Sequence, residues 1–385
     1  MNITKTWKVS KYHAVWLIFL ICLFPIHTDA MENGGVSAKA AVLIEQSSGQ
    51  ILFGKNETQR LPMASTTKIM TAIVALEHGN PEDIVTVSKE AAYTEGSSMY
   101  LHVGEEIRLE SLLYGLMLNS GNDAAIAIAE HISGSADAFA DLMNETAAKI
   151  GVKDTSFRNP NGLDAEGHFT TAYDLAMITR YGLSNPAFQE IVRTKTKAVE
   201  LDGRAGGRIL SNHNKMLKLY PGCDGVKTGF TKKCGRCLVS SATRDGMQLI
   251  AVTLNAPDDW NDHTYLLNYG FHTYKMLLMT VPDQEIEVQN GQSLLYVIPK
   301  EPAKLLIKKQ EESLYRLEIQ WNERLKAPIK ENQSVGKAIV YKDNKVVEKI
   351  LLIAQNKVEP LIPKPSYMEI LRKFFVSYNN HLQRG

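Results

Sequence analysis

The stretch that decides the fold of this chain lies at residues 62–72, which read Pro62-Met63-Ala64-Ser65-Thr66-Thr67-Lys68-Ile69-Met70-Thr71-Ala72. From Ile69 onward apolar residues recur at helical spacing until His78-Gly79-Asn80-Pro81 closes the run, which predicts a helix starting close to Ser65. Residues three apart share a helix face, so we expect the amine of Lys68 beside the hydroxyl of Ser65. A lysine whose pKa is lowered by burial or nearby cations can activate a serine nucleophile, and the Ser65 amide can face a developing oxyanion.

The segments on either side of this helix predict an α+β fold. A β-hairpin precedes the helix, because apolar runs at 41–45 and 50–53 flank the turn-forming Gln46-Ser47-Ser48-Gly49. Strands at both ends of a helical middle favour one composite antiparallel sheet. The remaining predicted elements are helices at 109–118, 123–133, 135–150 and 175–181 (the last opened by a capping box at Thr171–Asp174), strands at 225–231, 237–242 and 247–254, and a final helix at 262–277.

The first thirty residues are predicted to be a secretory signal peptide. Lysines precede an apolar run at 14–26, and small residues end the segment at Thr28-Asp29-Ala30. A retained membrane anchor is the alternative, but the run is shorter than the roughly 20 residues that span a bilayer. We therefore expect an exported protein.

The charge balance of the chain argues against nucleic acid binding. With 43 basic and 42 acidic residues, the chain lacks the basic excess that such binding requires.

Two further short motifs follow along the chain. Ser120-Gly121-Asn122 falls in a break between two predicted helices, where its side chains are free to face a cleft. Lys227-Thr228-Gly229 lies in a predicted edge strand, where Gly229 leaves room for an extended peptide and Lys227 offers positive charge to a terminal carboxylate. Alternation places Lys227 and Gly229 on one face and Thr228 on the other, unless the strand bulges.

Taken singly, each motif is weak evidence for an enzyme. Ser65 is equally typical of a helix N-cap, Ser120 of a turn and Lys227 of an ordinary strand. All three motifs nevertheless occur in order, each on the element that its chemistry requires and behind an export signal. This conjunction favours a serine acyl-transfer enzyme of the penicillin-interacting kind.

Longer strings around these motifs resemble the D-alanyl-D-alanine carboxypeptidases among the low-molecular-mass penicillin-binding proteins. The resemblance covers nearly the whole chain and is greatest to members from Gram-positive spore formers. It implies a serine penicillin-binding-protein and β-lactamase-like catalytic domain, with a role in cell-wall and spore-wall maturation. The strings are residues 62–72, Gly115-Leu116-Met117-Leu118-Asn119-Ser120-Gly121-Asn122-Asp123-Ala124-Ala125, Asp224-Gly225-Val226-Lys227-Thr228-Gly229-Phe230-Thr231 and the loop Phe157-Arg158-Asn159-Pro160-Asn161-Gly162-Leu163-Asp164.

The resemblance implies a two-step acyl transfer on peptidoglycan stem peptides that end in D-Ala-D-Ala, with no metal and no cofactor. Ser65 attacks the penultimate D-alanine carbonyl, Lys68 takes its proton, and Ser120 relays a proton to the leaving D-alanine. Water then hydrolyses the acyl-enzyme, and β-lactam antibiotics act as inhibitors. Lys68 as sole acylation base is disputed in related enzymes, and Lys227 is expected to assist Ser120 electrostatically.

The resemblance also implies the substrate-binding groups. Asn122 holds the substrate amide, while Lys227 and Thr228, beside Gly229, bind the terminal carboxylate. The backbone amides of Ser65 and Phe230 form the oxyanion hole. Some relatives carry arginine where this chain has His213 between two asparagines, which leaves the contribution of His213 to carboxylate recognition open.

Four other functions compete with carboxypeptidase activity. A D,D-transpeptidase or an endopeptidase would use the same acyl-enzyme with a different acceptor or scissile bond. A class A β-lactamase shares the motifs but carries an acidic Glu-x-x-Leu-Asn loop, which this sequence lacks. A non-catalytic peptidoglycan-binding protein would only hold its ligand in the cleft.

The chain beyond the catalytic domain, which we place at 31–278, divides into a β-rich domain at 279–360 and a tail at 361–385. Short alternating runs predict the β domain. The tail begins with a proline-rich spacer, and residues 367–382 form an amphipathic helix with Phe374 and Phe375 on its apolar face. We expect this helix to bind the outer face of the membrane, and docking on the β domain is the alternative.

Three cysteines follow the signal segment: Cys223, Cys234 and Cys237. The Cys234-Gly-Arg-Cys237 pair is compatible with a local disulfide, a redox pair or half a zinc site, but further zinc ligands at suitable spacing are not evident. A redox module would place the pair at the start of a helix, whereas a strand-like run follows it. The sequence favours a structural or incidental pair on a hairpin turn.

Overall fold

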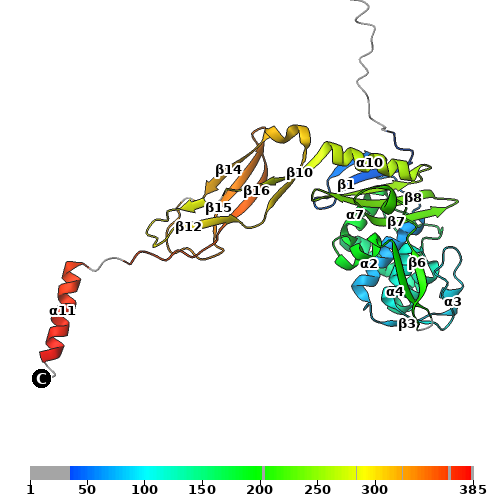
Figure 1. Cartoon of the computed structure of the whole chain (residues 1–385), viewed down its shortest axis with the longest axis horizontal. Coiled ribbons are helices and arrows are strands. Elements are labelled where there is room, and N and C mark those ends of the chain that lie inside the picture. Colours follow the sequence, from blue (N-terminus) through cyan, green and yellow to red (C-terminus); the bar gives the residue numbers. More distant parts are fainter. Residues whose placement is uncertain (1–34, 202–203, 283, 323, 363–365, 383–385) are drawn as a thin grey trace, which may run out of the picture.

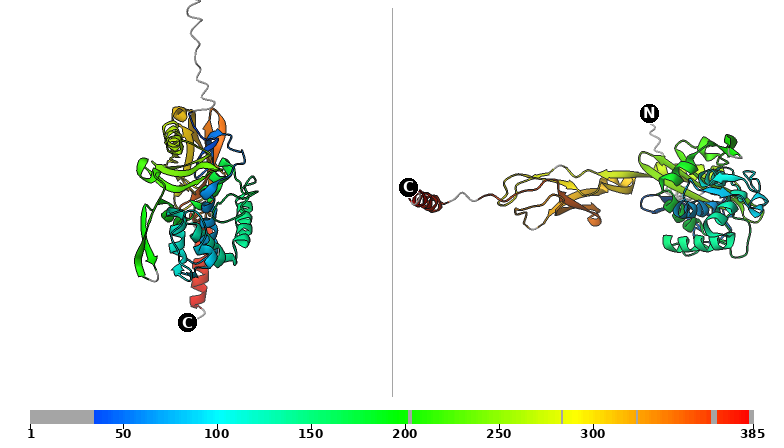
Figure 2. Two further views of the ribbon diagram at one scale, coloured as in Figure 1. Left: turned by 90° about the vertical axis from the view of Figure 1, so that its right-hand side faces the viewer. Right: turned by 90° about the horizontal axis from the view of Figure 1, so that it is seen from below.

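The computed structural model describes residues 35–201, 204–282, 284–322, 324–362 and 366–382. The predicted signal peptide at 1–30 lies outside these residues. Figure 1 shows a helix-rich N-terminal domain, an elongated β domain extending from one end of it, and a helix near the C-terminus. The right-hand view of Figure 2 shows the same extended arrangement.

A five-stranded antiparallel sheet forms the centre of the N-terminal domain, as predicted. Its strand order is β2-β1-β9-β8-β7, so the strand that carries Lys227 lies at the sheet edge. The hairpin at the start of the chain and three strands from its second half therefore share one sheet. The strands are β1 (Ala40–Glu45), β2 (Ile51–Lys55), β7 (Cys223–Thr231), β8 (Gly235–Arg244) and β9 (Met247–Leu254).

Helices cover both faces of this sheet. Along β1, Val42 and Ile44 join the apolar cluster beneath the helical subdomain, whereas Ala41 and Leu43 join a second cluster with α10 (Asp259–Thr273). Figure 1 shows α10 on one side of the sheet and α2, α4 and α7 on the other. This three-layer α+β architecture confirms the predicted fold class. The helices of the larger layer are α2 (Lys68–His78), α4 (Leu109–Leu118), α5 (Asn122–Ser133), α6 (Ala136–Ile150), α7 (Ala172–Gly182) and α8 (Pro186–Arg193).

Three local predictions need correction. Ser65 lies in a 3₁₀ turn, η1 (Ala64–Thr67), and the α-helix begins only at Lys68. The final helix ends at Thr273, because the next residues pair as a strand with the β domain. The capping box is only half formed: Thr171 accepts from the Asp174 amide at 3.0 Å, whereas the Asp174 carboxylate accepts from the Asp154 amide at 2.7 Å.

Two small antiparallel ribbons were not predicted. They pair β3 with β4 and β5 with β6, and each is too short or too irregular to give a clear alternation. The second ribbon is attached to the domain by the Arg208–Glu105 ion pair. The remaining short elements are β3 (Ile84–Thr86), α3 (Lys89–Ala92), β4 (Glu106–Arg108), β5 (Thr196–Leu201), β6 (Arg204–Ser211) and α9 (Met216–Leu219).

The C-terminal domain consists of strands, as predicted, around its own apolar core. A ribbon of β10 and β13 leads from the catalytic domain into a second five-stranded sheet, ordered β11-β12-β16-β15-β14. The boundary predicted at 278/279 falls inside β10. The elements are β10 (Tyr274–Met279), β11 (Gln284–Ile286), β12 (Leu295–Pro299), β13 (Ala303–Lys308), η2 (Lys309–Leu314), β14 (Tyr315–Trp321), β15 (Ser334–Lys342) and β16 (Lys345–Ala354).

The tail forms the predicted helix, α11 (Tyr367–Leu382). Its side chains are described as far as residue 376, and among them Phe374 is 68% and Phe375 61% exposed. Such exposure does not fit docking of these two rings on the β domain. Within the described part of the chain, no helix has the length and apolar character needed to cross a membrane.

Candidate active site

Ser65 and Lys68 meet where the 3₁₀ turn passes into α2. The amine Nζ of Lys68 lies 3.0 Å from Ser65 Oγ, so the predicted pairing of these side chains is present. Lys68 is fully buried, while Ser65 is half-buried and faces the cleft. A four-residue 3₁₀ turn followed by an α-helix thus keeps the expected neighbours together even though the α-helix starts later than predicted.

The hydrogen bonds of Lys68 determine what its amine can do chemically. Nζ donates to Asn122 Oδ1 at 2.7 Å and to the backbone carbonyl of Asn161 at 2.5 Å. A neutral amine has two N–H donors and one lone pair. These two acceptors occupy both donors, which leaves the lone pair directed at the Ser65 hydroxyl. This is the arrangement required of a general base.

The surroundings of Lys68 favour its neutral form. Burial is the main cause that holds the pKa of Lys68 well below its usual range, and the nearby charge of Lys227 lowers it further. Asp123 opposes this shift, although its carboxylate is engaged by the backbone amides of Met99 and Leu101, each at 3.1 Å.

Ser120 and Lys227 form a second serine–lysine pair. Lys227 Nζ lies 3.0 Å from Ser120 Oγ and also donates to the Thr228 carbonyl at 3.0 Å. Burial lowers the pKa of Lys227 to about 7. Ser120 has a φ of 60°, a left-handed conformation that is unfavourable for residues other than glycine and is found mainly at functional sites. This conformation places Ser120 between two helices, where its hydroxyl reaches strand β7.

The edge strand β7 lies directly against the turn that holds Ser65. A Cβ atom added to Gly229 would lie 3.2 Å from the backbone nitrogen of Ser65 and 3.1 Å from the Met63 carbonyl. Only a residue without a side chain lets the strand approach this closely without displacing the turn. The next residue, Phe230, is 65% exposed, and Thr228 is half-buried.

Asn161 is a site residue to which sequence reasoning gave no role. Its carbonyl accepts a hydrogen bond from Lys68 Nζ, and its neighbour Gly162, with a φ of 85°, packs against the Ala64 carbonyl. A Cβ at Gly162 would lie only 2.1 Å from that oxygen. The motif string around residues 157–164 drew attention to this loop, but a backbone contact carries no residue-type signal that could have identified Asn161.

His213 is partly exposed, and its backbone amide donates to the Leu118 carbonyl at 3.2 Å. Partial burial and the charge of Lys227 lower the pKa of its imidazole. The structure therefore brings His213 within electrostatic range of Lys227.

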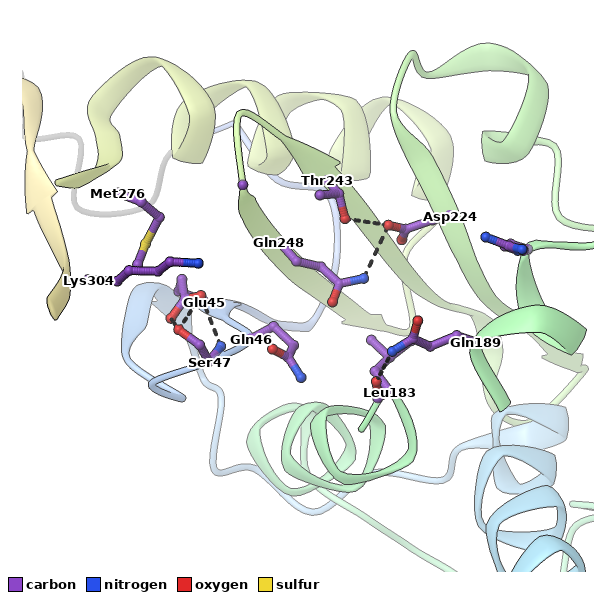
Figure 3. Close-up of a pocket in the computed structure, with 12 residues that line it drawn as sticks. Glu45, Gln46, Ser47, Leu183, Gln189, Asp224, Thr243, Gln248, Met276 and Lys304 are labelled. Atoms are coloured by element: carbon purple, nitrogen blue, oxygen red, sulfur yellow. Dashed lines mark hydrogen bonds between the residues drawn. The ribbon is translucent and has the colours of Figure 1, made fainter. Parts of the chain in front are cut away.

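One cavity lies beside the site, and a second lies away from it. One of about 530 Å³ is lined by Met63, Ala64, Asp164 and Cys234 and lies next to the Ser65 turn. The other, of about 330 Å³, lies near Glu45, Asp224 and Lys304, and no predicted site residue lines it (Figure 3). Its carboxylates are already satisfied: Glu45 accepts from Ser47, and Asp224 accepts from Thr243 and Gln248. Among the described residues, no group of three or more metal-ligating side chains is placed to hold a metal ion.

Comparison with known proteins identifies the family of this chain. The family model described as D-alanyl-D-alanine carboxypeptidase matches residues 27–258, more than half of the chain. The chain belongs to the D-alanyl-D-alanine carboxypeptidase family. This makes it a serine-type carboxypeptidase, as the sequence predicts, and a model of the penicillin-binding protein 5 C-terminal domain matches residues 274–360.

Individual relatives of this carboxypeptidase span most of its length. The D-alanyl-D-alanine carboxypeptidase DacF of Bacillus subtilis is 37% identical over 323 residues, which cover 80% of this chain and 83% of the relative. Penicillin-binding protein 5 from Haemophilus influenzae superposes with a TM-score of 0.67 at 28% identity, over 84% of this chain and 98% of that structure. A Streptomyces DD-transpeptidase superposes with a TM-score of 0.59 at 32% identity, over 62% of this chain and 98% of that structure.

Proposed function

We propose that this carboxypeptidase removes the terminal D-alanine from peptidoglycan stem peptides through an acyl-enzyme on Ser65. The observation that carries the proposal is the hydrogen-bonding pattern of Lys68, whose two acceptors leave its lone pair for the Ser65 proton at 3.0 Å. Ser65 attacks the penultimate carbonyl as Lys68 removes this proton, and the amides of Ser65 and Phe230 stabilise the oxyanion. The close approach of Gly229 to the Ser65 nitrogen supports this assignment.

Departure of the terminal D-alanine is assigned to the second pair. Ser120, 3.0 Å from Lys227, passes a proton to the leaving amine, and Lys227 supplies the charge that attracts the terminal carboxylate. Thr228 and Gly229 complete the carboxylate site, while Asn122 holds the substrate amide. Asn122 is well fixed for this role, because its Nδ2 donates to the Glu95 carbonyl at 2.6 Å. Water then releases the shortened peptide and restores the Ser65 hydroxyl.

Mass spectrometry after incubation with benzylpenicillin tests the nucleophile. We expect one added penicilloyl group on the tryptic peptide Leu61–Lys68 and none in Ser65→Ala. Labelling that persists in Ser65→Ala, or that falls on another peptide, would support a non-catalytic binding protein instead. Turnover of the adduct within seconds would favour a β-lactamase.

A transfer assay separates hydrolysis from transpeptidation, the activity named for the Streptomyces structure. The purified chain is incubated with a stem pentapeptide and a tripeptide-bearing acceptor, and free D-alanine and dimers are counted. We expect D-alanine with tetrapeptide and few dimers. Dimers as the main product would replace the carboxypeptidase assignment with a transpeptidase.

We further propose that the protein is exported and works at the outer face of the cytoplasmic membrane. In this arrangement residues 279–360 act as a spacer and the tail at 361–385 binds the lipid surface. The exposed rings of Phe374 and Phe375 support interfacial binding. We expect the full chain to sediment with anionic lipid vesicles and a variant lacking residues 361–385 to stay in solution. Equal sedimentation of both would contradict the anchoring role.

A role in spore-wall maturation remains part of the proposal. Its test is the peptidoglycan of a strain lacking the protein, compared between growing and sporulating cells. We expect stem pentapeptides to accumulate in the sporulating cells. Accumulation confined to growing cells would assign the enzyme to vegetative wall synthesis.

A further inference from the structure

The two cysteines of the β7–β8 turn lie at the junction of three segments that build the active site. Cys234 ends the turn, and its backbone amide donates to Thr231 Oγ1 at 3.0 Å. Its Sγ donates to Asp164 Oδ1 at 3.6 Å, and the nearby backbone amide of Ala64 helps to lower its pKa. Ala64 directly precedes Ser65. Cys234 therefore lies between the nucleophile turn, the loop that carries Asn161 and the end of strand β7, with its thiol facing the first two and its backbone amide the third.

Cys237 lies near Cys234 at the start of β8. It lies opposite Gly229 in the β7–β8 ladder, and each of the two thiols shifts the pKa of the other. Both side chains are buried, and the Cys237 thiol also faces the Pro62 carbonyl, 3.9 Å away. All three described cysteines are free thiols in this structure. A pair that looked structural or incidental in the sequence thus lies against residues that directly precede the nucleophile.

We propose that Cys234 and Cys237 form a redox-active dithiol, and that its oxidation to a disulfide by a low-molecular-weight disulfide slows acylation of Ser65. The cavity of about 530 Å³, which Cys234 lines together with Ala64 and Asp164, gives such a reagent a route to the thiol. The turn residues Lys232 and Lys233 are exposed, so a small opening of the turn uncovers the sulfur. The effect on acylation rests on the function proposed above, whereas formation of the disulfide does not.

The reactivity of the two sulfurs supports an ordered exchange. The hydrogen bond from Cys237 lowers the pKa of Cys234, and the same contact together with burial raises the pKa of Cys237. The Cys234 thiolate attacks one sulfur of the reagent, which forms a mixed disulfide and releases one thiolate. Cys237 then loses its proton to solvent and attacks Cys234 Sγ, which releases the second thiolate. Two protein thiols are oxidised, and one disulfide is reduced to two thiols.

The consequence for the site follows from the contacts that the disulfide removes. A sulfur in a disulfide has no proton to donate, so Cys234 loses its hydrogen bond to Asp164. It also turns toward Cys237 and away from the Ala64 amide. Loss of one or two such bonds next to Ser65 is expected to slow acylation about threefold to tenfold, the range that hydrogen bonds of ordinary strength provide.

The experiment equilibrates the purified chain with oxidised or reduced glutathione, unfolds it in guanidinium chloride that contains N-ethylmaleimide so that buried free thiols are also blocked, and digests it with trypsin. The sequence places a cleavage site between the two cysteines, after Arg236. Peptides Cys234–Arg236 and Cys237–Arg244 are therefore joined only when the disulfide exists. Cys223 serves as an internal control. Burial raises its pKa to about 12, so its thiol should resist oxidation and be recovered in the alkylated form from both buffers. The rate of benzylpenicillin acylation is measured on the same samples.

We expect joined peptides and slower acylation after oxidation, with both effects reversed by reductant. Cys223→Ser should respond like the wild type, whereas Cys234→Ser and Cys237→Ala should show neither effect. Cys237→Ala keeps the Cys234 contacts with Thr231 and Asp164. Its acylation rate in reductant should match that of the wild type, which checks that the loss of response does not come from misfolding. Alkylation of both cysteines in oxidising buffer would overturn the proposal, as would joined peptides with an unchanged rate. A reduced wild-type chain that penicillin does not acylate would contradict the proposed function instead.

Discussion

The catalytic domain and the C-terminal β domain use charged side chains in opposite ways. In the catalytic domain Lys68 and Lys227 are 0% and 1% exposed, and the buried Glu105–Arg208 pair holds the β5–β6 ribbon. In the β domain the described ion pairs stay at least partly exposed: the side chains of Lys342 and Glu311 are 30% and 29% exposed, and those of Lys357 and Glu359 are 74% and 56% exposed. Surface pairs contribute little to stability, whereas burying a charge costs free energy of folding. Buried charges are therefore expected where function or architecture needs them. The location of buried amines therefore distinguishes the catalytic domain from the C-terminal β domain.

The largest expected effect comes from removing the buried amine next to the nucleophile. We expect Lys68→Ala to lower the rate constant of benzylpenicillin acylation by about 10²–10⁴-fold, because a general base contributes that much. The matched control is Lys342→Ala in the β domain, which should leave the rate unchanged. Mass spectrometry of the adduct over time provides the measurement. Equal rates for the two variants would remove the distinction between buried and surface lysines.

The next effect concerns stability. Arg208→Leu leaves the Glu105 carboxylate buried without its partner, which should lower the free energy of unfolding by about 3–5 kcal/mol. Lys342→Ala breaks a pair that solvent already screens and should leave the denaturation midpoint unchanged. Urea unfolding of both variants, followed by circular dichroism, tests the contrast. A midpoint for Arg208→Leu that matches the wild type would show that the ribbon is held by other contacts.

A smaller effect appears in the pH dependence of acylation. The charge of Lys227 helps to lower the pKa of Lys68, so Lys227→Gln should raise the pKa of Lys68. At a given acidic pH more of Lys68 is then protonated and unable to act as a base. The acidic limb of the acylation profile should therefore move to higher pH, and this shift is separate from the overall loss of rate. Lys89→Gln, an exposed lysine on α3, is the control and should leave the limb in place. A limb that stays in place or moves to lower pH would contradict the coupling between the two amines.

The smallest effect is expected at the end of the chain. Deletion of residues 361–385 should leave both the acylation rate with soluble penicillin and the denaturation midpoint unchanged, because the described apolar side chains of α11 are largely exposed. The same variant is the one expected to lose vesicle binding. A lower midpoint would indicate that the tail packs on the rest of the protein.

Most of the fold was predictable where the signal is local and periodic. The hairpin, the helices α2, α4, α5, α6, α7 and α10, and the tail helix follow from apolar spacing and turn residues. The prediction was wrong at residues 274–277, where an apolar run that suits a helix pairs instead with β13 across the domain boundary. Such pairing depends on a partner strand about thirty residues away. In this segment the contacts with that strand outweigh the local preference for a helix.

The sequence by itself determined the reactive groups and their local spacing, since Ser65 and Lys68 are three residues apart and chain geometry alone makes them neighbours. Only the tertiary structure decided how the lysine is used. Its lone pair is directed by Asn122, 54 positions away, and by Asn161, 93 positions away, while Lys227 reaches Ser120 across 107 positions. The physical reason is that a helix fixes contacts over one turn, whereas partners far apart in the chain meet only when packing of the whole domain brings them together.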